Sequence, residues 1–428
     1  PALAVALLWG VHPLTTGAVT YIVQRAESLM AMFYLLMLYA AARAGARGRG
    51  TWGLLAVVAC WCGMLTKEVM VTAPLAVVLY DRAMRFPAWR AVFRARWRLY
   101  AALASGWVLL AGAMLMRRWF APVSFYAWKG TTPWAYLLTQ SEVIVHYLRL
   151  AAWPQPLCLD YRWPTVTSFA DVWPAFVLLS AVLAALGVLF VRRPAPAYAG
   201  LCFFLILAPS SSILPRPDNA FEHRMYLPLI VPILYLVLAC QCMGRHVAGA
   251  PARRRAAVRW SLALLCLGAA VALGRQTYRR NADFHSEVRL WQSVVAVRPG
   301  NLRARNDLAV ALAEEGRTAR ALQTYAALLD GIPADLRSRL RTGLELTTEG
   351  LPTDTPQYAY FRAHANMGTL QRKLGDDVKA LQHFILALRV LPEHDGVRAK
   401  ARAVLAARGV PASDRDREID RRIRSHEN

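Results

Sequence analysis

Long apolar runs separated by short arginine-rich loops dominate the first two thirds of the chain. A membrane crossing needs about 20 predominantly apolar residues, so runs approaching that length are candidate spans or parts of spans. The candidates are residues 30–42, 52–66, 69–80, 99–116, 173–191, 198–208, 225–242 and 260–273, with 1–11 as the end of another. This pattern predicts an all-α, polytopic transmembrane helical bundle over residues 1–283.

A charged pair interrupts one of these apolar stretches. Residues 52–80 as a single helix would be about 44 Å long, which exceeds the hydrocarbon core of about 30 Å. We therefore expect Lys67 and Glu68 to mark a break between two helical elements. Pro74 is expected to loosen the second element, because proline lacks the backbone N–H that a helix uses.

The composition changes near Phe284 to a mixed-charge pattern rich in Ala and Leu. Two sets of small, aromatic and proline residues recur there at matching offsets: Leu308, Ala309, Leu312, Gly316, Ala321, Tyr325 and Pro333, then Met367, Gly368, Gly375, Ala380, Phe384, Ala387 and Pro392. These offsets are those of the 34-residue tetratricopeptide helix–turn–helix repeat. An ordinary bundle would not require them, so an α-solenoid is predicted over 284–412, followed by a charged tail, 413–428, that is a solvated helix or disordered.

Positive charge is concentrated in the apolar part of the chain. Residues up to His285 include 9 acidic and 28 basic side chains, against 18 and 23 in the remainder. Much of the excess lies in arginine-rich loops such as 82–98 and 245–255, which the Lys/Arg bias places in the cytoplasm. The alternating spans then put the opposite loops and the C-terminal third on the periplasmic or lumenal side. Among those loops is 117–171, whose many aromatic residues are expected mainly to anchor it at the membrane interface. No basic stripe with interleaved aromatic side chains appears, which argues against a nucleic-acid partner.

Cysteine patterns and the common catalytic motifs add little. The pairs Cys60/Cys62 and Cys240/Cys242 lie in apolar runs without further ligands, which favours small buried hydrophobic side chains over a metal site or disulfides. No Walker, Rossmann, HExxH or GxSxG pattern is present. No metal ligands can therefore be named, although a divalent metal stays open as a cofactor.

Three charged sets stand at the ends of apolar runs on the predicted outer side. They are Arg25 with Glu27, Lys67 with Glu68, and Glu222-His223-Arg224. Ionisable groups at membrane depth are costly, so they suggest a functional site. One interpretation is that each set merely pairs locally and reaches toward the interface. The other is a shared site, in which the cations, with His12 or His223, hold a phosphate or pyrophosphate while the carboxylates orient them.

The segments HPLTTGAVTYIVQRAESL, LTKEVMVTAPLAVVLYD and EHRMYLPLI, followed by the repeats, resemble TMTC-type and PMT-related membrane glycosyltransferases of the GT-C fold. The resemblance implies transfer of a sugar, mannose in the TMTC branch, from a polyprenyl-phosphate carrier to a protein hydroxyl on the outer side. The matching charged positions are Arg25, Glu27, Lys67, Glu68, Glu222 and Arg224.

In GT-C enzymes the general base lies in the first outer loop, which we expect to precede Pro1. Within the chain, Glu27, Glu68 and Glu222 are the candidate carboxylates. The resemblance further implies an integral protein of the bacterial inner membrane or the endoplasmic reticulum, in contact with membrane lipid, with an acceptor or partner protein in the repeat groove. Two alternatives stay open: a non-catalytic scaffold that recruits partners through its repeats, and a polymerase or ligase acting on lipid-linked polysaccharides.

Overall fold

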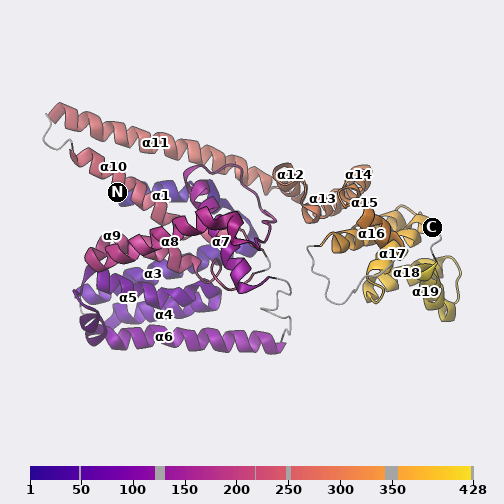
Figure 1. Cartoon of the computed structure of the whole chain (residues 1–428), viewed down its shortest axis with the longest axis horizontal. Helices are drawn as coiled ribbons and strands as arrows, with labels where there is room; N and C mark the ends of the chain where they lie inside the picture. The colour runs from indigo at the N-terminus through magenta and orange to yellow at the C-terminus, as the bar shows by residue number, and fades with distance from the viewer. Residues whose placement is uncertain (48–49, 121–130, 217, 247–251, 343–354, 426–428) are drawn as a thin grey trace. The chain divides into compact units, whose positions relative to one another are not determined.

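The computed structural model describes the whole chain except residues 48–49, 121–130, 217, 247–251, 343–354 and 426–428. The chain forms two compact units, Pro1–Phe284 and His285–Asn428 (Figure 1). Every regular element in the described part is an α-helix or a short 3₁₀-helix. The predicted all-α class is therefore confirmed.

The first unit contains eleven α-helices among its described residues. They are α1 (Ala2–Gly10), α2 (Thr16–Thr20), α3 (Arg25–Arg47), α4 (Gly50–Thr66), α5 (Ala73–Met84), α6 (Trp89–Phe120), α7 (Pro133–Ala152), α8 (Phe169–Arg192), α9 (Pro194–Leu207), α10 (Ile230–His246) and α11 (Ala252–Asp283). Four 3₁₀-helices join them: η1 (Pro13–Thr15), η2 (Ile22–Gln24), η3 (Glu68–Thr72) and η4 (Glu222–Met225).

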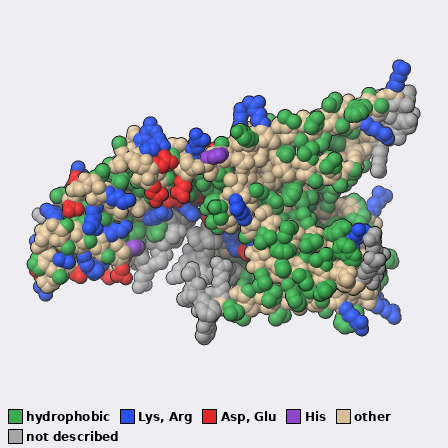
Figure 2. All heavy atoms as spheres, turned by 180° about the vertical axis from the view of Figure 1, so that it is seen from behind, with side chains coloured by type: hydrophobic (Ala, Val, Ile, Leu, Met, Phe, Trp, Pro, Cys, Tyr) green, Lys and Arg blue, Asp and Glu red, His purple; other side chains and the backbone are tan. Residues whose placement is uncertain are grey.

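Three described helical segments are long and apolar enough to cross a membrane: Trp89–Met116, Phe169–Arg192 and Ala256–Asp283. A fourth arises if Ala2–Gly10 and Pro13–Thr20, which meet at 61°, form one bent span. Figure 2 shows hydrophobic side chains covering much of the visible face of this unit, whereas charged side chains are prominent on the second unit. Such an apolar exterior is what a lipid-facing surface requires, so the first unit is an all-α bundle of the membrane type.

The predicted break at Lys67 and Glu68 is confirmed. Lys67 has an extended backbone, with φ −158° and ψ 144°, between α4 and η3. The two elements stay in close contact, since a Cβ on Gly63 would stand only 2.7 Å from Sδ of Met70. Pro74 does not loosen α5, because it lies in the first helical turn, where its missing N–H costs no hydrogen bond.

The loop 117–171, expected on the outer side, is not irregular throughout, because its middle part is the 20-residue helix α7. The side chain of Thr132 caps this helix by accepting a hydrogen bond from the Ala135 N–H. Because α7 contains polar residues, it does not stand out as an apolar run in the sequence. Its residues Thr139, Gln140 and Ser141 are nevertheless all buried. The aromatic residues Phe125, Tyr126 and Trp128, expected to anchor this loop at the interface, lie outside the described residues.

The second unit is built from short helices that pack in neighbouring pairs. They are α12 (Glu287–Val297), α13 (Leu302–Glu314), α14 (Thr318–Asp330), α15 (Ala334–Thr342), α16 (Pro356–Lys373), α17 (Asp377–Val390), α18 (Asp395–Ala407) and α19 (Arg415–Arg424). Gly316 and Gly375 close the α13–α14 and α16–α17 turns with φ of +76° and +82°, a conformation that glycine adopts without strain. Within the second pair, a Cβ on Gly368 would approach the Phe384 ring to 2.7 Å, so a larger residue would separate the helices.

The charged tail, expected to be either a solvated helix or disordered, forms the helix α19 over most of its described length, but this helix is not fully solvated. Ile419 in this helix is completely buried and belongs to the apolar core of the second unit. Ile423 also packs against this core, and the other residues of α19 are charged, so the helix has one buried face and one solvated face.

Candidate functional site

Lys67 and Glu27 form an ion pair between the α4–η3 break and the first turn of α3. Lys67 Nζ lies 2.7 Å from Glu27 Oε1 and 3.4 Å from Gln24 Oε1. The Glu27 residue is only 4% exposed. A carboxylate removed from water requires a partner of opposite charge, and Lys67 supplies it. The break at Lys67 is what allows a residue between two apolar helices to meet α3.

His223 lies beside this pair but is not an ionic partner. Its Nε2 is 3.9 Å from Glu27 Oε1, too far for a hydrogen bond. Burial, together with the charges of Lys67 and Arg224, lowers the pKa of His223 to about 2. The imidazole is therefore neutral, and it stacks on Phe221 with ring centroids 4.8 Å apart. It offers a hydrogen-bonding edge, not a positive charge.

Glu68 has a partner that sequence analysis missed. Arg216 Nη1 lies 2.8 Å from Glu68 Oε1, and the two side chains are 19% and 28% exposed. The only available signal was that Arg216 is the sole basic residue between Arg193 and Arg224. The Arg216–Glu68 pair is more exposed to solvent than the Lys67–Glu27 pair. The two pairs are linked through the chain, because Lys67 and Glu68 are adjacent residues.

Arg224 is held by backbone carbonyl groups of the segment before it. Its Nη1 donates to the carbonyls of Ser210 at 3.1 Å and Asn219 at 3.0 Å, and its Nη2 donates to that of Asp218 at 2.6 Å. Nη1 also lies 3.4 Å from the hydroxyl of the buried Tyr136 in α7. The planar guanidinium thus fastens the α9–η4 connection, and with it His223, to the bundle.

Glu222 belongs to a separate buried network. Its Oε1 accepts hydrogen bonds from the Cys158 N–H and, at 2.9 Å, from the Tyr161 hydroxyl. Its Oε2 lies 3.6 Å from Arg280 Nη2 in α11. Adjacent residues in sequence therefore serve different contacts: Glu222 ties the α7–α8 connection to α11, whereas His223 lies beside Glu27.

His12 and Arg25 form hydrogen bonds with backbone groups and do not join the other charged residues. The buried His12 accepts a hydrogen bond at Nδ1 from the Leu14 N–H, and its Nε2 lies 3.2 Å from the Ala151 carbonyl, so the proton is on Nε2. Arg25 is exposed and donates from Nε to the Val19 carbonyl at 3.2 Å. Of the sequence-predicted residues, Glu27, Lys67 and His223 are the ones the structure brings together, with Glu68 next in the chain. The described residues contain no group of three or more His, Cys, Asp or Glu that could hold a metal ion.

Curated proteins with similar sequences carry a common name. Protein O-mannosyl-transferase TMTC4 of Mus musculus is 24% identical over 368 residues, covering 76% of this chain and 48% of the relative. Protein O-mannosyl-transferase TMTC4 of Homo sapiens is 23% identical over 368 residues, which again cover 76% of this chain and 48% of the relative. Protein O-mannosyl-transferase F38B6.6 of Caenorhabditis elegans is 25% identical over 339 residues, 76% of this chain and 45% of the relative.

The chain spans about half the length of these relatives. No protein-family model and no solved structure matches it. The aligned relatives nevertheless confirm the resemblance drawn from the motifs: across 76% of its length, the chain is similar in sequence to proteins named protein O-mannosyl-transferases, TMTC4 among them.

Proposed function

We propose that this protein is a membrane glycosyltransferase that moves a sugar, mannose by analogy with its relatives, from a polyprenyl-phosphate carrier to a protein hydroxyl on the periplasmic or lumenal side. The relatives named protein O-mannosyl-transferases support the reaction class. The observation that carries the proposal is the cluster of Lys67, Glu27 and His223, which joins three segments far apart in the chain. The same three segments carry the family resemblance.

Lys67 is the residue we assign to the donor phosphate. Its ammonium has three N–H donors, and Glu27 and Gln24 take two of them. The third can donate to a phosphate oxygen and stabilise the negative charge that develops as the glycosidic bond breaks. Glu27 holds the ammonium in place, and the neutral His223 adds a hydrogen-bonding edge without repelling Lys67.

In the proposed step the acceptor hydroxyl oxygen bonds to the anomeric carbon while the bond from that carbon to the carrier phosphate breaks. A carboxylate takes the hydroxyl proton, and the polyprenyl phosphate leaves with the bonding electron pair. The family resemblance implies that this base lies in the first outer loop of such enzymes. Within the described residues Glu68 is more exposed than Glu27 and Glu222, at 28% of its side chain. The Arg216 partner would keep Glu68 ionised, as a base must be.

The second unit is proposed to be a tetratricopeptide solenoid that binds the acceptor or another protein. Its paired helices, the left-handed turns at Gly316 and Gly375 and the close Gly368–Phe384 contact support that assignment. Each pair buries its apolar face only against its neighbours, as stacked repeats do.

Transfer of radiolabelled mannose from a polyprenyl phosphate, in membranes containing the full protein, tests the proposal. Lys67→Met should lower transfer roughly tenfold to hundredfold, the effect of one lost charge-assisted hydrogen bond. Arg25→Met is the matched control, because Arg25 is exposed with a single backbone hydrogen bond; it should keep most of the activity. Equal activity in the Lys67→Met and wild-type proteins would remove the cluster from the donor site.

Product analysis separates the alternatives. Mannose on a protein hydroxyl supports the proposal, and lengthening of a lipid-linked glycan would indicate a polymerase or ligase. A wild-type protein that inserts, folds and transfers no sugar would favour the scaffold.

A further inference from the structure

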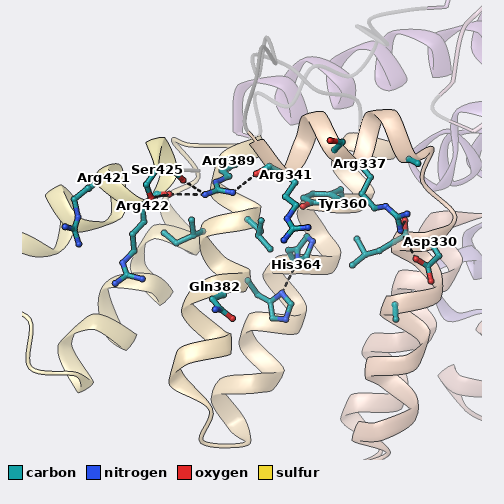
Figure 3. A pocket seen from close by; sticks show the side chains of 17 residues that line it. Asp330, Arg337, Arg341, Tyr360, His364, Gln382, Arg389, Arg421, Arg422 and Ser425 are labelled. Atoms are coloured by element: carbon teal, nitrogen blue, oxygen red, sulfur yellow. Dashed lines mark hydrogen bonds and ion pairs between the residues drawn. The ribbon is translucent and has the colours of Figure 1, made fainter. Parts of the chain in front are cut away.

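The second unit contains a cavity of about 880 Å³ whose walls come from α14, α15, α16, α17 and α19 (Figure 3). Among the described residues, five arginines line it, against one acidic residue, Asp330. The arginines are Arg337, Arg341, Arg389, Arg421 and Arg422. A concave site with this charge balance attracts anions and excludes cations.

Arg389 is the buried centre of this charge. The residue is 5% exposed, and its Nη1 and Nη2 donate to the backbone carbonyls of Arg341 and Ser425. Its Nε has no hydrogen-bond partner in the described part of the chain. Within that part it also has no carboxylate within ion-pair distance. A guanidinium so removed from water without an anion is costly, and an anionic ligand would offset that cost.

Arg341 carries a second uncompensated charge at the same cavity. It is exposed, and the described residues give it no ion pair. The other lining arginines differ, since Arg337 pairs with Asp330 at 2.7 Å, and both Arg421 and Arg422 pair with Glu418 at 2.6 Å. As far as the described residues show, two of the five guanidinium groups are therefore available to a ligand without first breaking an ion pair.

The rest of the wall indicates the size and kind of ligand. Leu329, Ile385 and Leu386 provide apolar surface between the arginines. His364 and His383 share a hydrogen bond between their Nδ1 atoms at 2.9 Å, so one ring donates and the other accepts. Apolar and cationic groups together in a cavity of this volume fit an extended peptide better than a small inorganic anion.

We propose that this cavity binds an acidic peptide segment of a protein partner, with carboxylates on Arg341 and Arg389 and apolar side chains against Leu329 and Leu386. Planar guanidinium groups bind carboxylates through paired hydrogen bonds, which gives the contact direction as well as charge. The proposal uses only the geometry of the second unit and does not rest on the proposed glycosyl transfer.

Fluorescence anisotropy with the full-length protein in detergent tests it. The probe is a short labelled peptide of alternating Glu and Leu, compared with the same peptide carrying Gln in place of Glu. The Glu peptide should bind at least about tenfold more tightly, because each charge-assisted hydrogen bond it loses on substitution is worth that much. Its affinity should fall as salt is raised, because the lining residues Arg341 and Arg421 are exposed to solvent.

Arg341→Gln should weaken binding of the Glu peptide by about tenfold or more. Arg339→Gln is the matched control: Arg339 lies on the same helix, is exposed, pairs with Asp335 at 3.3 Å and does not line the cavity. It should bind within about twofold of the wild type. Arg341 is preferred to Arg389 for this test, because replacing Arg389 also removes bonds to backbone carbonyls.

Equal affinity for the two peptides, or unchanged affinity in Arg341→Gln, would overturn the proposal. The proposal would also be overturned if the protein did not bind the Glu peptide but bound inorganic phosphate or phosphatidylglycerol vesicles through Arg341. Either of those results would assign the cavity to a phosphate group.

Discussion

Lys67 Nζ and Glu27 Oε1 are 2.7 Å apart although 40 positions separate them in the chain. The carboxylate is almost fully buried, whereas the Lys67 side chain keeps 19% of its exposure. The pair is thus anchored on its acidic side and open on its basic side. That asymmetry suits a cation that must hold its position and still reach a ligand.

Removing one member of this pair should cost more than removing both. Lys67→Met leaves the Glu27 charge buried without its partner, and we expect a loss of about 1–3 kcal/mol, less than for a fully buried pair because Lys67 is partly exposed. In the double variant Glu27→Gln/Lys67→Met the uncompensated charge is gone, so part of the stability should return. Thermal unfolding of detergent-solubilised protein measures the stability of the wild type, the two single variants Lys67→Met and Glu27→Gln, and the double variant, which together form a double-mutant cycle. Strictly additive losses would show that the two residues are not coupled.

Arg224→Lys should impair the protein although the charge is kept. The guanidinium spans the carbonyls of Ser210, Asp218 and Asn219, and an ammonium cannot reach all three in the same geometry. We expect about 1–3 kcal/mol of lost stability and a roughly tenfold or greater loss of transfer, since His223 would lose its support. Arg25→Lys, which affects only one exposed backbone hydrogen bond, is the control and should behave like the wild type. Full transfer by Arg224→Lys would mean that a positive charge alone is sufficient there.

The second unit should lose stability in mild acid because of His364. Burial, with some repulsion from His383 and Arg341, lowers the pKa of His364 from 6.5 to about 3. Below pH 6.5 the unfolded chain takes up a proton that the folded chain refuses, so stability falls as the pH drops from about 6.5 toward 3. At pH near 4.5 the loss from this residue is about 2–3 kcal/mol.

Hydrogen–deuterium exchange of α16 and α17 in the full chain, corrected for the intrinsic pH dependence, measures this loss. The variant His364→Gln keeps a polar side chain without the titration, so its protection should depend less steeply on pH than that of the wild type. Identical pH profiles in the two proteins would exclude His364 as the cause.

Topology can be tested with single cysteines introduced into a chain whose 7 native cysteines have been replaced. A membrane-impermeant thiol reagent should label Arg320→Cys from the periplasmic or lumenal side and Arg192→Cys only after the membrane is opened. Both positions are exposed, so access is decided by sidedness and not by burial. A cytoplasmic Arg320→Cys would reverse the orientation predicted from the arginine-rich loops and move the charged sets with it.

Local features of the sequence were sufficient to predict the helices and breaks that depend on hydropathy and on backbone conformation. Apolar runs predicted most helices of the first unit, and the length limit of a membrane span predicted the break at Lys67 and Glu68. The recurring offsets of small, aromatic and proline residues predicted helix–turn–helix pairs in the second unit, where Gly316 and Gly375 adopt positive φ between the paired helices. Helix α7 was not predicted, because some of its buried residues are polar. Hydropathy along the sequence does not reveal a polar residue that is buried against other parts of the protein.

Which charged residues pair with one another was decided only by the tertiary structure. Glu222 and His223 are adjacent in sequence yet enter different networks, because the 3₁₀ turn η4 separates their side chains. The partners Arg216 and Arg280 could not be chosen in advance, since opposite charges attract at any sequence separation and only folding brings particular ones into contact. The cationic cavity of the second unit has the same origin: α15 and α17, distant in sequence, both line it and bring Arg341 and Arg389 together, and no carboxylate in the described part of the chain pairs with either.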